Sequence, residues 1–180
     1  MGNLFTSYLC CFKSKKSNQN HLHSHNSFDF YDFTEDLKNI KYDNTQLFIP
    51  PIKQGLVIKV YDGDTITIAS KLPYNESPIY RFSVRLNGID CPEIKGSNED
   101  EKKCAIIARD TVSELLLGKM IRLENLQTEK YGRILADVYL DKLHINNYLL
   151  EKHLAVKYDG GTKIKPDNWL EYYSNLKTQD

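Results

Sequence analysis

Residues 60–68 read VYDGDTITI, with two aspartates around a glycine between an apolar run and alternating isoleucine and threonine. An Asp-Gly pair between two β-patterned runs is typical of a tight hairpin turn, because glycine tolerates a positive φ. Asp62 and Gly63 therefore account for a turn, and they leave Asp64 without a structural role. Neighbouring acids repel each other unless a positive group lies close by, and either a bound cation or a surface lysine would relieve that repulsion.

The sequence on both sides of this turn has the pattern of a small β-rich domain. Strands are predicted at residues 56–60, 65–69, 79–87, 120–127 and 133–140, with a further short strand at 154–158. Helices are predicted at 98–117, near 146–153 and after Pro166. Five short strands with a helix inserted late predict an α+β fold, a five-stranded Greek-key barrel of the OB type packed with about three helices.

The long helix has recognisable ends and one apolar face. Ser97-x-x-Asp100 resembles a capping box at its start, and Gly118 is typical of a residue just past a helix end. The residues that share a face at helical spacing are Cys104, Ile107, Ala108, Thr111 and Leu115. We therefore expect one continuous helix with a single buried face.

Length, charge and cysteine spacing bound the class of protein. The chain has 180 residues, which suits one domain with a tail, and its 24 basic side chains balance its 24 acidic ones. A protein held on nucleic acid by charge alone would carry a basic excess, so the balance argues against that class. No CxxC spacing occurs among the cysteines, which argues against a zinc site or a disulfide framework and fits a reducing cytosolic environment.

The chain is predicted to divide into a leader, residues 1–53, and a folded domain, residues 54–180. Residues 1–27 contain three lysines, no acids and a polar tract, so they bury too little apolar surface to offset the entropy of ordering. We expect this segment to be disordered. A more aromatic stretch at 28–50 follows it and is compatible with a short helix or strand.

The leader begins with a lipidation-type pattern. MGNLFT matches M-G-x-x-x-[ST], in which Gly2 accepts a myristoyl chain. One such chain binds membranes only marginally, and a second signal is present in the adjacent thiols of Cys10 and Cys11, suited to palmitoylation, and in a small basic cluster that begins at Lys13. We expect a lipid anchor at the cytoplasmic face of a membrane. The alternative is an unmodified leader on a soluble cytoplasmic protein.

Polar clusters mark the ends of the predicted strands. They are Asp64, Arg85, Asp90-Cys91-Pro92-Glu93 and Lys130-Tyr131-Gly132-Arg133. Each alone is explained by a turn, a solvated strand face or a loop. Together, two carboxylates suit a hard, oxygen-preferring cation such as Ca²⁺, and a third suits the activation of water. Two arginines suit bidentate contacts to a phosphoryl group, so the set predicts phosphodiester cleavage.

The same motifs carry a family resemblance. DGDT, the strand ending in RLNGIDCPE and the turn KYGR occur in the order and with about the spacing of the staphylococcal nuclease-like (thermonuclease) family, which the chain resembles over roughly residues 54–160. The resemblance implies an OB-type barrel that cleaves DNA and RNA with Ca²⁺. It also implies the role of each residue: Asp64 and Asp90 as side-chain metal ligands, Cys91 as a ligand through its backbone carbonyl, Arg85, Glu93 and Arg133 as catalytic residues, and Lys130, Tyr131 and Tyr158 as nucleotide-binding residues.

One position departs from the family, which has threonine where this chain has Cys91; a ligand that acts through its backbone tolerates that change. We therefore predict a monomeric, calcium-dependent nuclease, a hydrolase acting on single-stranded DNA and RNA. The alternative is a non-catalytic nuclease-like module that binds nucleic acid or protein, as in Tudor-containing scaffold proteins that have lost the catalytic charges. All five charged positions are filled here, which favours the enzyme.

Overall fold

The computed structural model of this protein describes residues 37–96, 98–129 and 131–177. The chain falls into two units, one ending at Thr45 and one beginning at Gln46. In the described part of the first unit, a short 3₁₀ helix, η1, spans Tyr42–Asn44. None of the described helices is long and apolar enough to cross a bilayer.

The predicted leader lies largely outside the described residues. Gly2, Cys10 and Cys11 all belong to the part that is not described. The lipid anchor therefore stays a prediction, and so does the division of the chain into residues 1–53 and residues 54–180.

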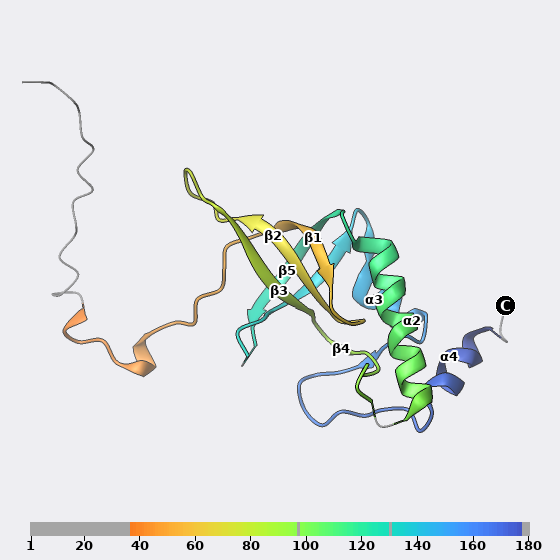
Figure 1. The fold of residues 1–180 in the computed structure, drawn as a ribbon. Helices are drawn as coiled ribbons and strands as arrows, with labels where there is room; N and C mark the ends of the chain where they lie inside the picture. The colour runs from red at the N-terminus through yellow and green to blue at the C-terminus, as the bar shows by residue number, and fades with distance from the viewer. Residues whose placement is uncertain (1–36, 97, 130, 178–180) are drawn as a thin grey trace, which may run out of the picture. The chain divides into compact units, whose positions relative to one another are not determined.

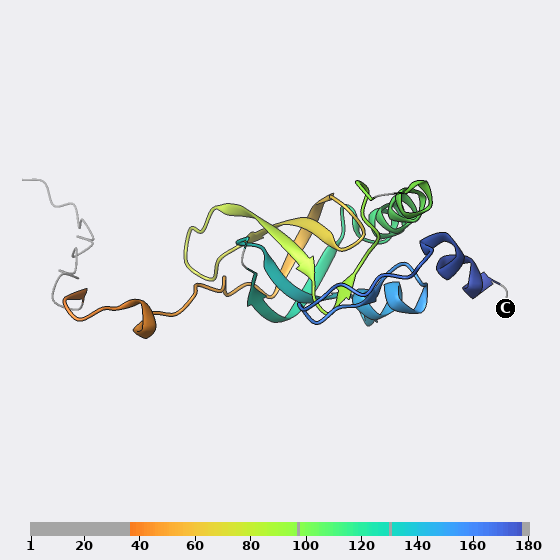
Figure 2. The ribbon, with the colours of Figure 1, turned by 90° about the horizontal axis from the view of Figure 1, so that it is seen from below.

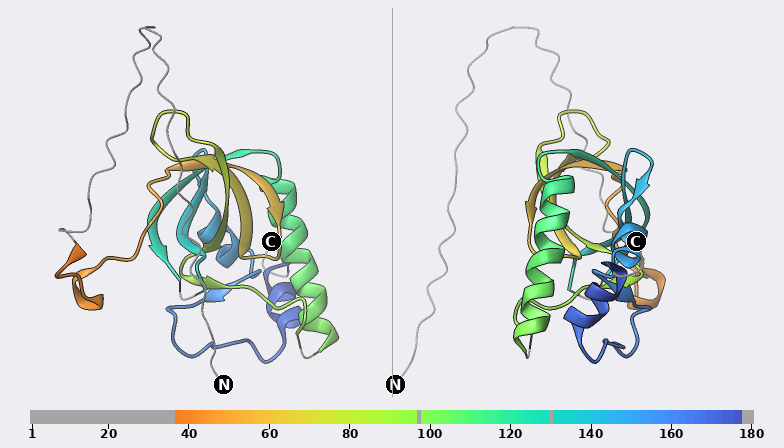
Figure 3. Two further views of the ribbon diagram at one scale, coloured as in Figure 1. Left: turned by 60° about the vertical axis from the view of Figure 1, so that its left-hand side comes forward. Right: turned by 90° about the vertical axis from the view of Figure 1, so that its right-hand side faces the viewer.

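A closed five-stranded barrel forms the centre of the second unit (Figure 1). Its strands are β1 (Gln54–Val60), β2 (Thr65–Lys71), β3 (Ile79–Leu86), β5 (Met120–Thr128) and β6 (Ile134–Leu140). They pair in the order β3-β2-β1-β5-β6, and a parallel pairing of β3 with β6 closes the barrel. The two views of Figure 3 show the strands curling around a common centre. The predicted α+β fold with an OB-type barrel is confirmed.

Short strands extend the barrel at two places. Strand β7 (Leu143–His144) pairs with β6, and β4 (Ile89–Asp90) pairs antiparallel with β8 (Val156–Lys157). The predicted strand at 154–158 is therefore present, as β8. Its pairing with β4 matters for function because it brings Asp90 next to the segment that follows β8.

Alternate residues of the strands line the barrel interior. Ile66 and Ile68 of β2, and Val84 and Leu86 of β3, are fully buried. Because successive side chains of a strand point to opposite faces, this alternation decides which face of each strand turns inward. Full burial of one such side chain contributes about 1.5–3 kcal/mol, so the register is strongly fixed. Arg85, between Val84 and Leu86, is thereby directed to the other face of β3.

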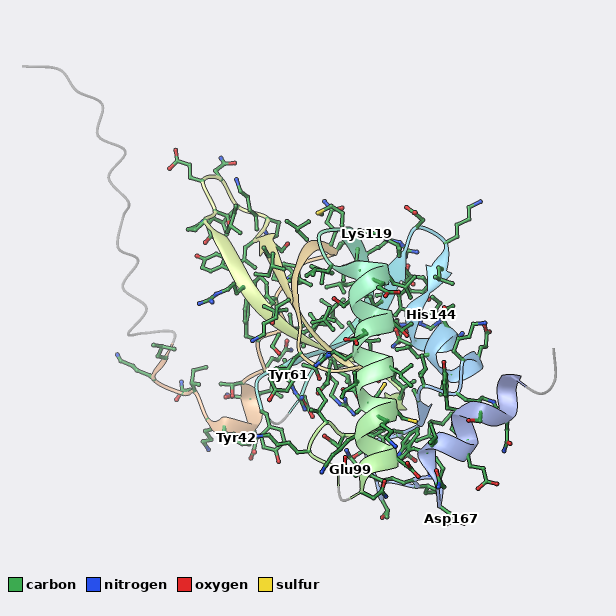
Figure 4. The ribbon with its side chains drawn as sticks, turned by 45° about the vertical axis from the view of Figure 1, so that its right-hand side comes forward. Tyr42, Tyr61, Glu99, Lys119, His144 and Asp167 are labelled. Atoms are coloured by element: carbon green, nitrogen blue, oxygen red, sulfur yellow. The ribbon has the colours of Figure 1, made fainter. Side chains whose placement is uncertain are left out.

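Three α-helices among the described residues pack around the barrel: α2 (Glu99–Leu116), α3 (Ile145–Glu151) and α4 (Trp169–Lys177). Helix α2 packs against β1, and α4 lies beside α2 (Figure 2). In Figure 4, Glu99 marks the first turn of α2, and Lys119 lies just past its end. The number and order of the helices agree with the prediction.

The start of α2 is capped by Asn98, one residue after the predicted cap. The Asn98 side-chain oxygen accepts a hydrogen bond of 2.7 Å from Glu101 N. Ser97, the predicted cap, lies outside the described residues. Serine and asparagine cap helices about equally well, so local pattern could not choose between the two neighbours.

The buried face of α2 is rotated by about one residue from the predicted face. It consists of Glu101, Cys104, Ala105, Ala108, Val112 and Leu116. Cys104 and Ala108 were predicted to be there, whereas Ile107, Thr111 and Leu115 lie at the half-buried edge. The prediction followed the larger side chains, while the close packing against the barrel selects the small Ala105 and Ala108.

Candidate active site

Residues 61–64 form the loop between β1 and β2, which begins at Tyr61 (Figure 4). Gly63 does not have the positive φ that the turn prediction assumed. A Cβ at this position would instead lie 2.8 Å from both Cys91 Sγ and Ala108 Cβ. Glycine is therefore required by the close approach of this loop to α2 and to Cys91, which corrects the prediction.

Asp64 ends this loop and is only 5% exposed. Its carboxylate forms an ion pair with Arg85, and its Oδ2 accepts a hydrogen bond of 2.9 Å from Cys91 N. Its Oδ1 also accepts a hydrogen bond of 3.1 Å from Thr65 Oγ1. Thr65 lies opposite Arg85 in the pairing of β2 with β3, so the barrel register itself brings the arginine to Asp64. The positive group that offsets the second acid is therefore a strand arginine.

Arg85 also joins Asp64 to Asp90. Its Nη2 donates to Asp90 Oδ1 at 2.9 Å and to Ile89 O at 3.3 Å. Arg85 is 8% exposed and Asp90 is 1% exposed. Burial lowers the pKa of Arg85, but the charges of Asp64 and Asp90 outweigh it and raise that pKa. Two carboxylates therefore share one charged guanidinium.

Burial and the nearby carboxylates raise the pKa of two groups beside the cluster. Burial, and then the charge of Asp64, raises the pKa of Asp62 to about 6. Burial, and then the charge of Asp64, also raises the pKa of the Cys91 thiol well above its ordinary value, so the thiol stays neutral. The Cys91 backbone lies beside Asp64, but its N–H makes the contact. The role of its carbonyl as a metal ligand, which the resemblance implied, stays a prediction.

The cluster fits a hard divalent cation. Asp90 Oδ2 is buried and has no hydrogen-bond partner among the described residues. Such an oxygen is costly to bury, and a cation would satisfy it. Carboxylate oxygens are ligands that Ca²⁺ takes readily. Three or more acidic, histidine or cysteine side chains do not gather at one point anywhere in the described ranges, so Asp64 and Asp90 would need backbone carbonyls or water to complete a coordination shell.

Glu93 lies three residues after Asp90, in the connection between β4 and α2. Its Oε1 is 3.0 Å from Lys163 Nζ, and the same ammonium is 2.8 Å from Asp90 Oδ1. Sequence reasoning missed Lys163, which is 70 residues from Glu93 in a loop without a motif. Its place just after the last predicted strand was the only signal, and only the tertiary fold brings it to the carboxylates.

Arg133 reaches the cluster through Thr65. Its Nη1 donates to Thr65 Oγ1 at 3.5 Å, and its Nε and Nη2 donate to the two carboxylate oxygens of Glu129 at 2.5 and 2.8 Å. Gly132 has a φ of 76°, so the tight turn before Arg133 requires glycine. The structure thus brings Arg133 near Asp64 while Glu129 holds its guanidinium in a bidentate ion pair.

The predicted nucleotide-binding residues have different outcomes. Lys130 lies outside the described residues. Tyr131 is 72% exposed, and it is not part of the wall of the neighbouring pocket that the described residues form. Tyr158 does line that pocket, which has a volume of about 1090 Å³ and is also lined by Arg85, Glu129 and Leu135. The fold and site together define a class, the OB-type barrel with an acidic, arginine-containing site beside an open pocket.

Comparison with known proteins identifies the family to which the chain belongs. A family model described as staphylococcal nuclease homologue matches residues 83–177, more than half of the chain. The chain belongs to this family.

Named relatives agree with that placement. A Haemophilus influenzae protein named as an uncharacterized endonuclease is 35% identical over 102 residues, which cover 57% of this chain and 51% of that protein. The thermonuclease of Staphylococcus hyicus is 34% identical over 101 residues, which cover 55% and 56%. A probable endonuclease of Schizosaccharomyces pombe is 29% identical over 132 residues, which cover 61% and 57%. The chain thus spans a little over half the length of these relatives.

Proposed function

We propose that this protein is a calcium-dependent nuclease that hydrolyses phosphodiester bonds in single-stranded DNA and RNA. The observation that carries the proposal is the buried cluster of Asp64, Arg85 and Asp90, in which one carboxylate oxygen has no hydrogen-bond partner among the described residues. Arg85 of the cluster also lines a pocket of about 1090 Å³, which is large enough to hold a nucleotide. Family membership and the names of the relatives support the same activity.

Asp64 and Asp90 would hold the cation, with the backbone carbonyl of Cys91 as a further ligand. When bound, Ca²⁺ would offset negative charge on a phosphate oxygen and lower the barrier to attack. Glu93 takes one proton from the attacking water. The water oxygen forms a bond to phosphorus while the bond from phosphorus to the 5′-oxygen breaks. The 5′-oxygen leaves with a proton from solvent, and the other product keeps a 3′-phosphate.

Arg85 and Arg133 stabilise the charge that develops on the phosphoryl oxygens. Each presents a planar fork of N–H donors, which lysine cannot reproduce. Preorganised donors of this kind typically contribute about 3–4 kcal/mol to lowering the barrier. Arg85 is held by two buried carboxylates and Arg133 by Glu129, so both are oriented before substrate binds.

The pocket wall suits a nucleotide. The Tyr158 ring offers a surface on which an unpaired base can stack. For Lys130 and Tyr131 the nucleotide-binding role rests on their place in the KYGR motif. Stacking of this kind needs bases that are already splayed apart, which is why we propose single strands as the preferred substrate. The chain would act as a monomer, because every proposed site residue comes from one copy.

Incubation of the full chain with labelled single-stranded DNA and RNA tests the activity. We expect cleavage of both with calcium, no cleavage with a calcium chelator, and cleavage by Glu93→Gln with calcium that is slower by a factor of roughly 10²–10⁴. Equal cleavage in the chelator would show that the metal assignment is wrong. Binding without cleavage by the parent protein would instead support the non-catalytic module.

The leader supports a second part of the proposal, that acylation of Gly2, Cys10 and Cys11 tethers the nuclease to the cytoplasmic face of a membrane. One acyl chain gives marginal binding, and two stabilise it. A fluorescent protein fused to the C-terminus tests this in cells. Gly2→Ala should release the fusion to the cytosol, and the paired change Cys10→Ser and Cys11→Ser should weaken retention. An unmutated fusion that is already soluble rules out the anchor.

A further inference from the structure

Residues 159–168, which connect Tyr158 to α4, contact the acidic edge of the site, and we refer to them as the strap. Lys163 Nζ of the strap is 2.8 Å from Asp90 Oδ1 and 3.0 Å from Glu93 Oε1. It also lies 5.9 Å from the centre of the Tyr158 ring. One ammonium therefore contacts a proposed metal ligand, the proposed general base and the pocket wall.

A second lysine holds the strap nearby but does not contact the proposed ligands. Lys165 Nζ is 2.7 Å from Glu101 Oε1, on the buried face of α2. Asn168 adds a hydrogen bond of 3.3 Å to Asp100 Oδ2. The strap is thus fixed at two places on α2 independently of Lys163, so loss of the Lys163 contact need not detach it.

Lys163 is a charged group at this place. Its Nζ forms ion pairs with the carboxylates of both Asp90 and Glu93. Asp90 Oδ1 consequently accepts from two cations, Arg85 and Lys163. A divalent cation bound to the same carboxylate would repel the ammonium and draw the shared negative charge toward itself.

The two cations that share Asp90 differ in how firmly they are held. Arg85 comes from the middle of the barrel sheet and its side chain is 9% exposed, whereas the Lys163 side chain is 39% exposed. A long, partly solvated lysine side chain leaves such a pair at little free-energy cost, because water takes over its hydrogen bonds. Lys163 is therefore the group that yields when a stronger cation arrives.

We propose that Lys163 is a built-in competitor for calcium, which lowers the affinity of the Asp64–Asp90 site for the ion until the ion displaces it. This inference rests on the proposed calcium-dependent function. The competition sets the calcium concentration at which the site fills. It also links filling of the site to release of Glu93, since the same ammonium holds both carboxylates.

Isothermal titration of the full chain with calcium chloride alone tests the inference without nucleic acid. Lys163→Met should bind calcium roughly three- to tenfold more tightly than the parent, because calcium no longer has to displace the two partly exposed ion pairs that Lys163 makes with Asp90 and Glu93. Lys165→Met is the matched control, because it removes the same charge from the same strap, and its dissociation constant should stay within about twofold of the parent. Lys163→Arg keeps a cation in place and should also stay near the parent.

Hydrogen exchange gives a second readout. Calcium should increase amide exchange in residues 160–164 of the parent and change it little in Lys163→Met. Equal calcium affinity of the parent and Lys163→Met would overturn the inference while leaving the proposed function intact. The same holds if Lys165→Met and Lys163→Met tighten binding equally, because charge alone would then explain the effect. If no variant and no parent binds calcium, the proposed calcium dependence is wrong as well.

Discussion

The inner and outer halves of the site are built in different ways. The inner half consists of Asp64, Arg85 and Asp90, which are 5%, 8% and 1% exposed and are placed by paired strands. The outer half includes Glu93 and Lys163, whose side chains are 49% and 39% exposed and belong to loops. The inner groups are fixed by the same register that packs the barrel core, whereas solvent screens the outer pair.

The difference in burial predicts which half of the site contributes to stability and which contributes mainly to catalysis. Removing one partner of a buried ion pair typically costs about 3–5 kcal/mol, because the other charge is left uncompensated. An exposed pair typically contributes about 0.2–1 kcal/mol. Changes in the inner half should therefore lower both stability and activity, and changes in the outer half should alter activity or calcium affinity with little effect on stability. The outer groups are also the ones that are free to rearrange around a cation or a substrate.

The largest effect is expected for Glu93→Gln. Loss of the general base should lower kcat by roughly 10²–10⁴, since glutamine cannot accept the proton from water. The free energy of unfolding should change by less than about 0.5 kcal/mol, because the side chain is half exposed. Glu99→Gln, which removes an exposed carboxylate paired with Lys102, is the control and should change neither. A large loss of stability in Glu93→Gln would contradict the division into two halves.

Arg85→Lys and Arg133→Lys compare a buried arginine of the site with a partly exposed one. Each should lower kcat by roughly 10²–10³, because lysine does not present a bidentate fork. Their unfolding free energies should differ, with a loss of about 1.5–3 kcal/mol for Arg85→Lys, whose charged hydrogen bonds are buried. Arg133→Lys should lose under about 1 kcal/mol, because its pair with Glu129 is partly exposed. Urea unfolding monitored by Trp169 fluorescence measures both, and equal losses would show that burial does not separate the two arginines.

The inner half of the site was predictable from the sequence because it depends on local patterns. The Asp-Gly turn, the alternation around Arg85 and the break after Asp90 each mark a strand end, and strand pairing brings such ends together. The outer half was predictable only in part. Glu93 follows from its motif, but its contact with Lys163 joins loops 70 residues apart, which no short-range pattern encodes.

The sequence also did not predict where two backbone segments pack at close range. Gly63 was correctly recognised as a position that needs glycine, but for its φ and not for its contact with Cys91 and Ala108. The buried face of α2 was likewise displaced by about one residue, because small side chains mark a close approach more weakly than large ones mark a core. In both cases the missing information is how near one backbone comes to another.

Gly63→Ala tests that close approach and should lower activity less than the arginine changes do. The added Cβ would lie 2.8 Å from Cys91 Sγ and Ala108 Cβ, so the loop or the helix must shift. Overpacking of this kind typically costs about 1–3 kcal/mol, and a shift of the adjacent Asp64 should also weaken calcium binding. In a double-mutant cycle, Ala108→Gly should recover part of the loss. Additive losses would mean that the contact with Ala108 is not what makes glycine necessary.

The smallest effect is expected for Glu129→Gln, which tests whether the outer half depends on orientation. Glu129 is a positioning residue, because it holds the Arg133 guanidinium through two hydrogen bonds of 2.5 and 2.8 Å. Loss of its charge should lower kcat about two- to fivefold, the range that a partly exposed ion pair can supply, while KM changes little. The effect should shrink at high salt, since screening already weakens the pair in the parent. Glu124→Gln removes the carboxylate partner of Arg122, a more exposed pair within β5, and should leave kcat unchanged. Equal effects of the two glutamines on kcat would mean that Glu129 acts only through the net charge of the surface and does not orient Arg133.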